Sequence, residues 1–142
     1  MHDILIQQFK QEVTSLGVQE LQTPDDVDAL LRNHQGTALV FVNSVCGCAG
    51  GVARPALRMA LQHTIKPDIA ATVFASSDRE ATARAREFFT GMPPSSPSFA
   101  LLRDGKLVQM IHRSEIEIRD AHQVAELLIQ AFERHCVVPS KN

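Results

Sequence analysis

The amino-acid sequence predicts an α/β fold, a central mixed β-sheet with helices on both faces. Segments with helical spacing of apolar residues alternate with short apolar runs, which is typical of parallel strands joined by helices. Two of these runs, 38–43 and 69–76, are apolar at most positions, as strands covered on both faces must be. Asp104-Gly105 lies between two later runs and predicts a hairpin, so the sheet gains an antiparallel edge.

Composition limits the class of protein. With 142 residues we expect a single domain, 1–142, large enough to bury a core. A net charge of -2 and the absence of Trp and Tyr argue against nucleic-acid and anionic-membrane partners. No run approaches the roughly 18 apolar residues of a membrane span. The first residues lack the basic and apolar regions of a signal peptide, so we expect a cytoplasmic location.

The first elements follow from apolar spacing and capping signals. Residues 2–16 predict a helix with one apolar face, and 18–22 a short edge strand. Thr23-Pro24-Asp25-Asp26 predicts the start of a second helix, with Thr as N-cap, Pro at the first position and acids in the first turn. That helix should run to about Asn33 and lead into the strand at 38–43.

The middle of the chain predicts two more helices around the strand at 69–76. One should run over 51–64, with Pro55 early, where a missing N–H matters least. Ser77, with Glu80 three residues on, predicts a capping box for a helix that continues through Phe89.

The last third predicts the hairpin and a closing helix. After the proline-rich loop 92–97, strands are expected over 98–102 and 106–111. Asp120 and Gln123 predict the capped start of the final helix. The order α-β-α-β-α-β-α-β-β-α is the thioredoxin-like arrangement, in which sites lie at the carboxyl ends of the strands.

The motif Cys46-Gly47-Cys48 stands between the strand at 38–43 and the helix that follows. Unpaired backbone N–H groups at a helix N-terminus favour negative charge, so they stabilise a thiolate there. The placement predicts thiol–disulfide exchange. We expect Cys46, at the exposed strand end, to be the nucleophile and Cys48 to be the resolving thiol.

Two other functions remain open from the residues alone. The three cysteines Cys46, Cys48 and Cys136 could belong to a zinc or iron–sulfur module, although a C-x-C spacing is shorter than the usual zinc knuckle. A general disulfide reductase or isomerase would use the same pair. We expect Cys136 to be a half-buried thiol at the end of the last helix, away from the cysteine turn.

Three separated segments resemble the bacilliredoxin family. They are Val45-Cys46-Gly47-Cys48-Ala49-Gly50-Gly51 with Ala53-Arg54-Pro55-Ala56, then Pro93-Pro94-Ser95-Ser96-Pro97-Ser98, and Phe132-Glu133-Arg134-His135-Cys136. The segment Ile111-His112-Arg113-Ser114-Glu115-Ile116-Glu117 also matches, except that Ser114-Glu115 stands where relatives are expected to have His-Glu. The resemblance covers nearly the whole chain.

The resemblance implies a cytosolic thioredoxin-like oxidoreductase that removes the small thiol bacillithiol from mixed disulfides on proteins. The implied partners are S-thiolated client proteins and the small thiol as co-substrate, with no other cofactor and no metal. A weak disulfide isomerase activity is also associated with the family.

Four further residues are candidates for substrate binding. Gly47 would let a bulky disulfide approach. Arg54 would hold the thiolate charge or the carboxylates of a small thiol; the alternative is a solvated arginine on the helix face. In thioredoxin-like folds the residue before the last hairpin is often a cis proline facing the thiols. We therefore expect a cis bond before Pro97, with the Ser96 backbone presented to substrate, against the alternative of a trans proline that ends a loop.

Overall fold

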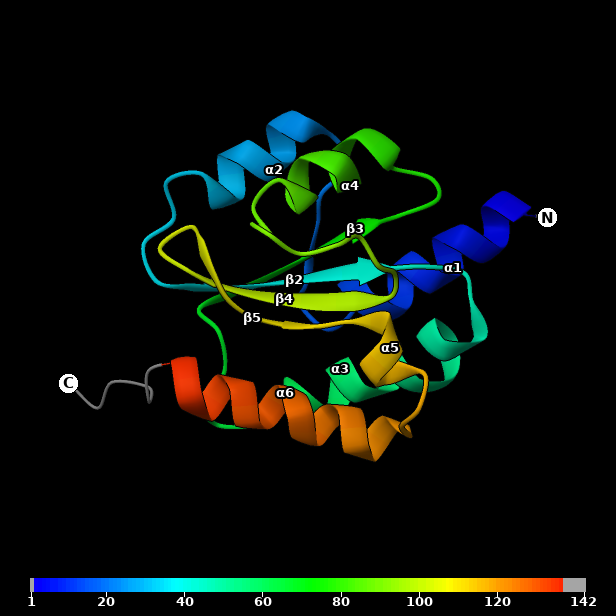
Figure 1. The fold of residues 1–142 in the computed structure, drawn as a ribbon. Coiled ribbons are helices and arrows are strands. Elements are labelled where there is room, and N and C mark those ends of the chain that lie inside the picture. The colour runs from blue at the N-terminus through cyan, green and yellow to red at the C-terminus, as the bar shows by residue number, and fades with distance from the viewer. Residues whose placement is uncertain (1, 137–142) are drawn as a thin grey trace.

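The computed structural model describes residues 2–136, in which one five-stranded sheet lies between two layers of helices (Figure 1). The strands are β1 (Gln19–Glu20), β2 (Thr37–Asn43), β3 (Ile69–Phe74), β4 (Ser98–Arg103) and β5 (Lys106–Ile111). The helices are α1 (His2–Thr14), α2 (Pro24–Leu31), α3 (Arg54–Ala60), α4 (Arg79–Arg86), α5 (Arg113–Ile116) and α6 (Ala121–His135), with a π-helix, η1 (Ala49–Ala53), directly before α3.

The sheet is mixed, as the sequence predicts. Its strand order is β1-β3-β2-β4-β5. The pairs β1–β3 and β3–β2 are parallel, whereas β4 runs antiparallel to both β2 and β5. Antiparallel pairing therefore already begins in the middle of the sheet, next to β2. The hairpin forms at Asp104-Gly105, where both residues have positive φ.

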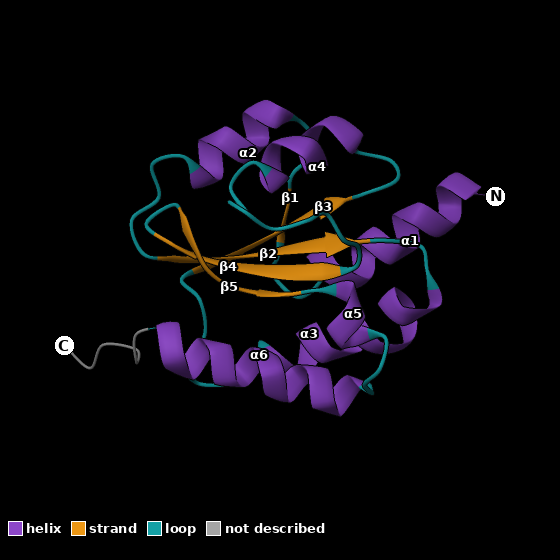
Figure 2. Ribbon diagram, in the orientation of Figure 1, coloured by secondary structure: helices purple, strands orange, loops and turns teal. Residues whose placement is uncertain are grey.

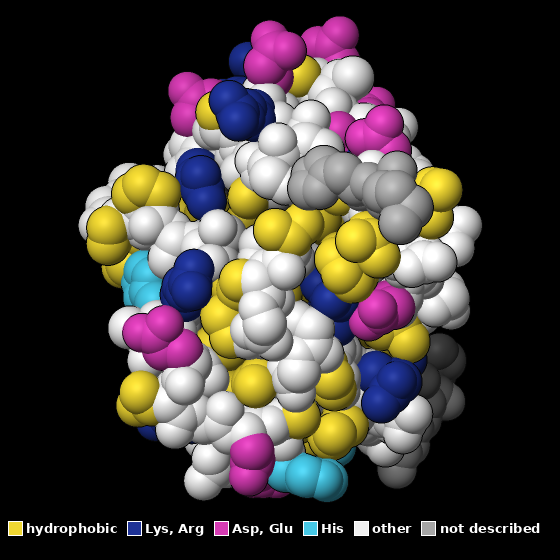
Figure 3. Space-filling view, turned by 90° about the vertical axis from the view of Figure 1, so that its right-hand side faces the viewer, with side chains coloured by type: hydrophobic (Ala, Val, Ile, Leu, Met, Phe, Trp, Pro, Cys, Tyr) yellow, Lys and Arg dark blue, Asp and Glu magenta, His cyan; other side chains and the backbone are white. Residues whose placement is uncertain are grey.

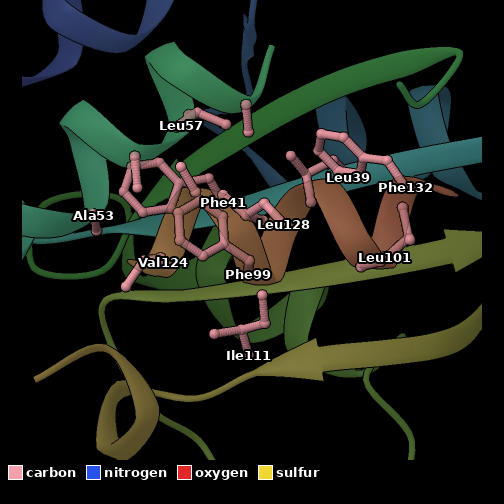
Figure 4. Packing of buried hydrophobic residues seen from close by; sticks show 14 of the residues in the cluster. Leu39, Phe41, Ala53, Leu57, Phe99, Leu101, Ile111, Val124, Leu128 and Phe132 are labelled. Atoms are coloured by element: carbon pink, nitrogen blue, oxygen red, sulfur yellow. The ribbon is translucent and has the colours of Figure 1, made fainter. Parts of the chain in front are cut away.

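Two hydrophobic clusters cover the two faces of the sheet. Helices α2 and α4 lie on one face, and α1, α3 and α6 on the other (Figures 1 and 2). On the α3–α6 face the rings of Phe41 and Phe99, from neighbouring strands, stack with their centroids 4.7 Å apart. Leu57, Leu128 and Phe132 pack around them (Figure 4). β2 is buried along its whole length, so both clusters fix the strand that leads to the cysteines.

The N-cap predicted at Thr23 and the capping box predicted at Asp120 are confirmed. Thr23 and Asp120 cap α2 and α6, each with the reciprocal side-chain contact that a capping box requires. The box predicted at Ser77 is wrong, because α4 begins one residue later with Asp78 at the N-cap and no side-chain cap. The Asp78 carboxylate is 2.7 Å from the ammonium of the buried Lys10, and this ion pair ties α4 to α1.

Several helices differ from the prediction, and α1, α2 and α3 end at Thr14, Leu31 and Ala60 rather than at 16, 33 and 64. α4 ends at Arg86, and the backbone to Phe89 continues in tighter turns with i→i−3 hydrogen bonds. α5, only four residues long, was not predicted. The helix after the cysteines begins at Ala49 as a π-helix rather than at Gly51 as an α-helix. Within residues 2–136, no helix has the length and apolar character needed to cross a membrane.

Candidate active site

The cysteine turn leaves the carboxyl end of β2, the central buried strand (Figure 2). The Sγ atoms of Cys46 and Cys48 are 2.9 Å apart, and both cysteines are free thiols. Both side chains are partly exposed, so a disulfide on another molecule can reach them. The two thiols predicted to act together therefore do lie together.

The surroundings of Cys46 favour its thiolate. Burial by itself raises the pKa of Cys46, but hydrogen bonds from Cys48, from Ser44 and from the backbone N–H of Ala49 outweigh it, so the pKa lies below that of an ordinary thiol. The Ser44 hydroxyl lies 3.3 Å from the Cys46 sulfur. The positive charge of Arg113 acts in the same direction. Cys46 is thus the thiol that ionises first.

The pKa of Cys48 is shifted in the opposite direction, upward. Burial raises the pKa of Cys48, and the neighbouring Cys46 thiolate raises it further through their hydrogen bond and through charge repulsion. Cys48 also packs against the hydrophobic cluster on the α3–α6 face. In the reduced protein Cys48 therefore keeps its proton and donates it in a hydrogen bond to the Cys46 sulfur.

The π-helix that follows the cysteines is explained by Pro55 and two glycines. The N–H of Arg54 bonds to the carbonyl of Ala49, five residues back. Pro55 has no N–H with which to continue an α-helical ladder, and Gly50 and Gly51 let the backbone widen. A Cβ on Gly50 would lie 2.8 Å from the Arg54 guanidinium, so the glycine leaves room for this side chain.

Arg54 is buried, with 4% of its surface exposed, so the alternative of a solvated helix-face arginine is wrong. Its guanidinium donates to Asn43 Oδ1 at 3.0 Å, to the Ser44 carbonyl at 2.9 Å and to Glu12 at 3.0 Å. It also lies over the ring of Phe9. These contacts fix the segment that leads into Cys46. A role for Arg54 in holding a ligand stays a prediction, since its observed partners are all within the protein.

Arg113 is the cation that acts on the sulfur atoms, and sequence reasoning assigned it no role. It opens α5, and its charge favours the thiolate form of both Cys46 and Cys48. Its guanidinium donates to the Ser96 carbonyl at 3.3 Å. The available signal was its place in the Ile111–Glu117 segment that matches the family. Only the fold shows that β5 returns this segment to the cysteine turn.

The bond between Ser96 and Pro97 is cis, which confirms the predicted cis bond, whereas a role for Pro97 in substrate binding stays a prediction. Ser96 and Cys46 line the same open recess, of about 420 Å³. Gly47 has open space around it, with no atom within 4 Å of where a Cβ would stand. The structure thus brings Ser96 to the recess of Cys46, although Ser96 uses its carbonyl for Arg113, and leaves Gly47 open beside Cys46 in the chain.

Cys136 lies at the opposite end of β2. Burial raises the pKa of Cys136, whose thiol accepts a hydrogen bond from Thr37, the first residue of that strand. β2 has seven residues, which at about 3.3 Å per residue separates its ends by about 20 Å. A metal site that uses all three cysteines is therefore excluded. Among the described residues, no group of three His, Cys, Asp or Glu side chains could hold a metal ion.

Solved structures with the same fold include thioredoxins. The thioredoxin of Fasciola hepatica has a TM-score of 0.59 and 22% identity, over 83% of this chain and 99% of its own. That of Malassezia sympodialis has a TM-score of 0.59 and 15% identity, over 83% and 90%. At this identity the likeness shows the fold alone, which is thioredoxin-like as predicted.

Sequence relatives are much closer. The model of the disulphide isomerase family matches residues 1–136. A bacilliredoxin of Geobacillus kaustophilus is 52% identical over 136 residues, which are 96% of this chain and 93% of the relative. A bacilliredoxin of Koribacter versatilis is 52% identical over 134 residues, 94% and 92% of the two chains. The chain belongs to the bacilliredoxin family and is a thiol–disulfide oxidoreductase with the Cys-x-Cys pair described above.

Proposed function

We propose that this protein removes bacillithiol from mixed disulfides on client proteins, with Cys46 as nucleophile and Cys48 as resolving thiol. The observation that carries the proposal is the opposite shift of the two pKa values, lowered for Cys46 and raised for Cys48, at a turn that is open to other molecules. The substrate follows from the family, whose relatives carry the name bacilliredoxin.

The first step is attack by the Cys46 thiolate on the bacillithiol sulfur of the mixed disulfide. The client leaves as a thiolate with its cysteine reduced, and bacillithiol becomes joined to Cys46. Arg113, beside both sulfur atoms, stabilises the negative charge before attack. Arg54 acts as a positioning residue, because it holds the Ser44 carbonyl at the base of the turn.

The second step is attack by Cys48 on the Cys46 sulfur, which expels bacillithiol and forms the Cys46–Cys48 disulfide. Once Cys46 is in a mixed disulfide it carries no charge, so the repulsion that raises the pKa of Cys48 is removed. Cys48 thus becomes easier to ionise after the first step. The protein has then lost two electrons to the substrate, and thiols of a reducing cytoplasm, its proposed location, must restore the dithiol.

The test uses a reporter protein carrying one bacillithiol in mixed disulfide. Reduced wild-type protein should release the bacillithiol, and the intact mass of the reporter should show loss of the adduct. Over the same time, Cys46→Ser should show only the uncatalysed loss. Retention of the adduct by wild type would refute the proposal.

A general disulfide isomerase is the second candidate, favoured by the family match to disulphide isomerases. It predicts that scrambled disulfides in a model substrate are rearranged as fast as small-thiol adducts are released. A comparison of the two rates with one preparation decides between these functions.

A further inference from the structure

Three arginines line the recess that contains Cys46. Arg79 and Arg86 lie on α4 and Arg113 on α5, while Ser44, Ser76 and Ser96 contribute polar groups. None of the described residues that line the recess is acidic. Its volume of about 420 Å³ is within the range of small-molecule sites. On the face of the molecule at the carboxyl end of β2, Lys and Arg side chains lie among hydrophobic ones (Figure 3).

The charges of Arg79 and Arg86 are not neutralised. Within residues 2–136 neither forms an ion pair, unlike Arg84 on the same helix, which pairs with Asp28 and Glu87. Arg86 is partly buried and donates to the Ser95 carbonyl at 3.3 Å. Burial lowers the pKa of Arg86, which marks a guanidinium taken partly out of water. An anion in the recess would compensate this cost.

The direction of the reaction decides which half of the mixed disulfide occupies the recess. Cys46 attacks the small-thiol sulfur, so the small thiol stays at Cys46 while the client departs. Contacts between the recess and the small thiol are therefore the same for every client protein, whatever the surface of that client. A guanidinium matches a carboxylate by two parallel hydrogen bonds, and several guanidiniums at separate positions match more than one carboxylate.

We propose that the recess binds the small-thiol half of the substrate, and that Arg79 and Arg86 recognise it by its carboxylates. The occupant is a thiol with at least two carboxylates. This inference rests on the proposed function for its substrate and adds how that substrate is selected.

The first experiment compares two mixed disulfides of one reporter protein, with the dicarboxylate mercaptosuccinate and with neutral 2-mercaptoethanol. Arg79→Gln/Arg86→Gln should slow mercaptosuccinate release about tenfold and leave 2-mercaptoethanol release within about twofold. The matched control is Arg58→Gln/Arg84→Gln, which changes net charge equally but outside the recess, and should leave both rates unchanged. If the two double variants slow mercaptosuccinate release equally, the effect comes from the net charge of the protein and not from Arg79 and Arg86 in the recess. That result would overturn the proposal.

The second experiment does not depend on disulfide release. Peptide mass spectrometry would follow alkylation of Cys46 by iodoacetate, which carries a carboxylate, and by the neutral iodoacetamide. The ratio of the iodoacetate rate to the iodoacetamide rate reports carboxylate binding near the sulfur. The ratio should fall severalfold in Arg79→Gln/Arg86→Gln and not in the control. Arg86→Lys, which keeps the charge, should retain most of the ratio even if Arg86→Gln disturbs the fold.

These readouts separate the two proposals. An unchanged ratio in the Arg79→Gln/Arg86→Gln variant overturns the carboxylate site even if bacillithiol is released normally. A lowered ratio in that variant, in a protein that releases no small thiol from clients, keeps the site and refutes the proposed function.

Discussion

The two ends of β2 each lie beside a cysteine, and the two thiols have opposite properties. At the carboxyl end Cys46 is partly exposed and surrounded by donors, and its pKa is lowered. At the amino end Cys136 is buried in the core, and burial raises its pKa. The same side chain is thus a nucleophile or a packing group according to its solvent access and the donors around it.

Substitution of Cys46 should have the largest effect, and the contrast with substitution of Cys136 tests this comparison directly. Cys46→Ser should reduce release of a small thiol from a reporter protein to the uncatalysed rate, because the other thiol at this end of β2, Cys48, has a raised pKa and packs against the hydrophobic cluster. Cys136→Ser should stay within about twofold of wild type, since distant sites act independently. Single-turnover release assays measure both. If Cys136→Ser is as damaging as Cys46→Ser, the two ends are coupled and the comparison fails.

Alkylation should show the same contrast without any substrate. At neutral pH we expect iodoacetamide to modify Cys46 about a hundredfold faster than Cys136, because Cys46 ionises at lower pH and is more accessible. Peptide mass spectrometry over time gives both rates in one sample. Protein unfolded in denaturant is the control, where the two rates should converge. Similar rates in the folded protein would contradict the structure.

Cys48→Ser distinguishes the roles of the two thiols at the carboxyl end of β2. The first step should remain, because the serine hydroxyl can still donate to Cys46, but the protein should accumulate as a mixed disulfide between Cys46 and the small thiol. Intact mass would show an adduct of one small thiol, absent in Cys46→Ser/Cys48→Ser. If Cys48→Ser is inactive and Cys46→Ser forms the adduct, the two roles are reversed.

Arg113→Gln should give the smallest effect. The charge of Arg113 lowers the pKa of Cys46, so its removal should move the pH midpoint of Cys46 alkylation upward, with Arg58→Gln unchanged as control. The rate at neutral pH should change only severalfold, because a thiol of higher pKa is less ionised but more nucleophilic as thiolate, with a Brønsted slope of about 0.4–0.5. A midpoint that does not move would show that the hydrogen bonds alone stabilise the thiolate.

Local sequence patterns were enough to predict most helices and strands and the reactive pair of cysteines, Cys46 and Cys48. Apolar spacing predicted every strand and five of the helices, and Cys46 and Cys48, separated by one residue in the sequence, also lie together in space. The start of α4 was predicted one residue too early, and its N-cap residue, Asp78, directs its carboxylate to Lys10 on α1 rather than to the helix. A pattern confined to residues 77–80 cannot contain that contact.

The electrostatics of the site could not be predicted from local patterns. Arg54 is close to the cysteines in sequence, yet its hydrogen bonds run to Asn43, Ser44 and Glu12. Arg113 is remote in sequence and acts on the sulfur atoms. Only the pairing of β5 with β4 and of β4 with β2 brings it there.

Arg54 also joins α1 to the cysteine turn, through its hydrogen bond to Glu12 and its contact with the ring of Phe9. Asn43 adds a hydrogen bond to the Phe9 carbonyl at 3.3 Å. A shortened chain that begins after α1 would keep both cysteines and every strand. It would lose the partners that hold the buried guanidinium in place, so α1 belongs to the smallest functional unit and should not be trimmed in designing a minimal protein.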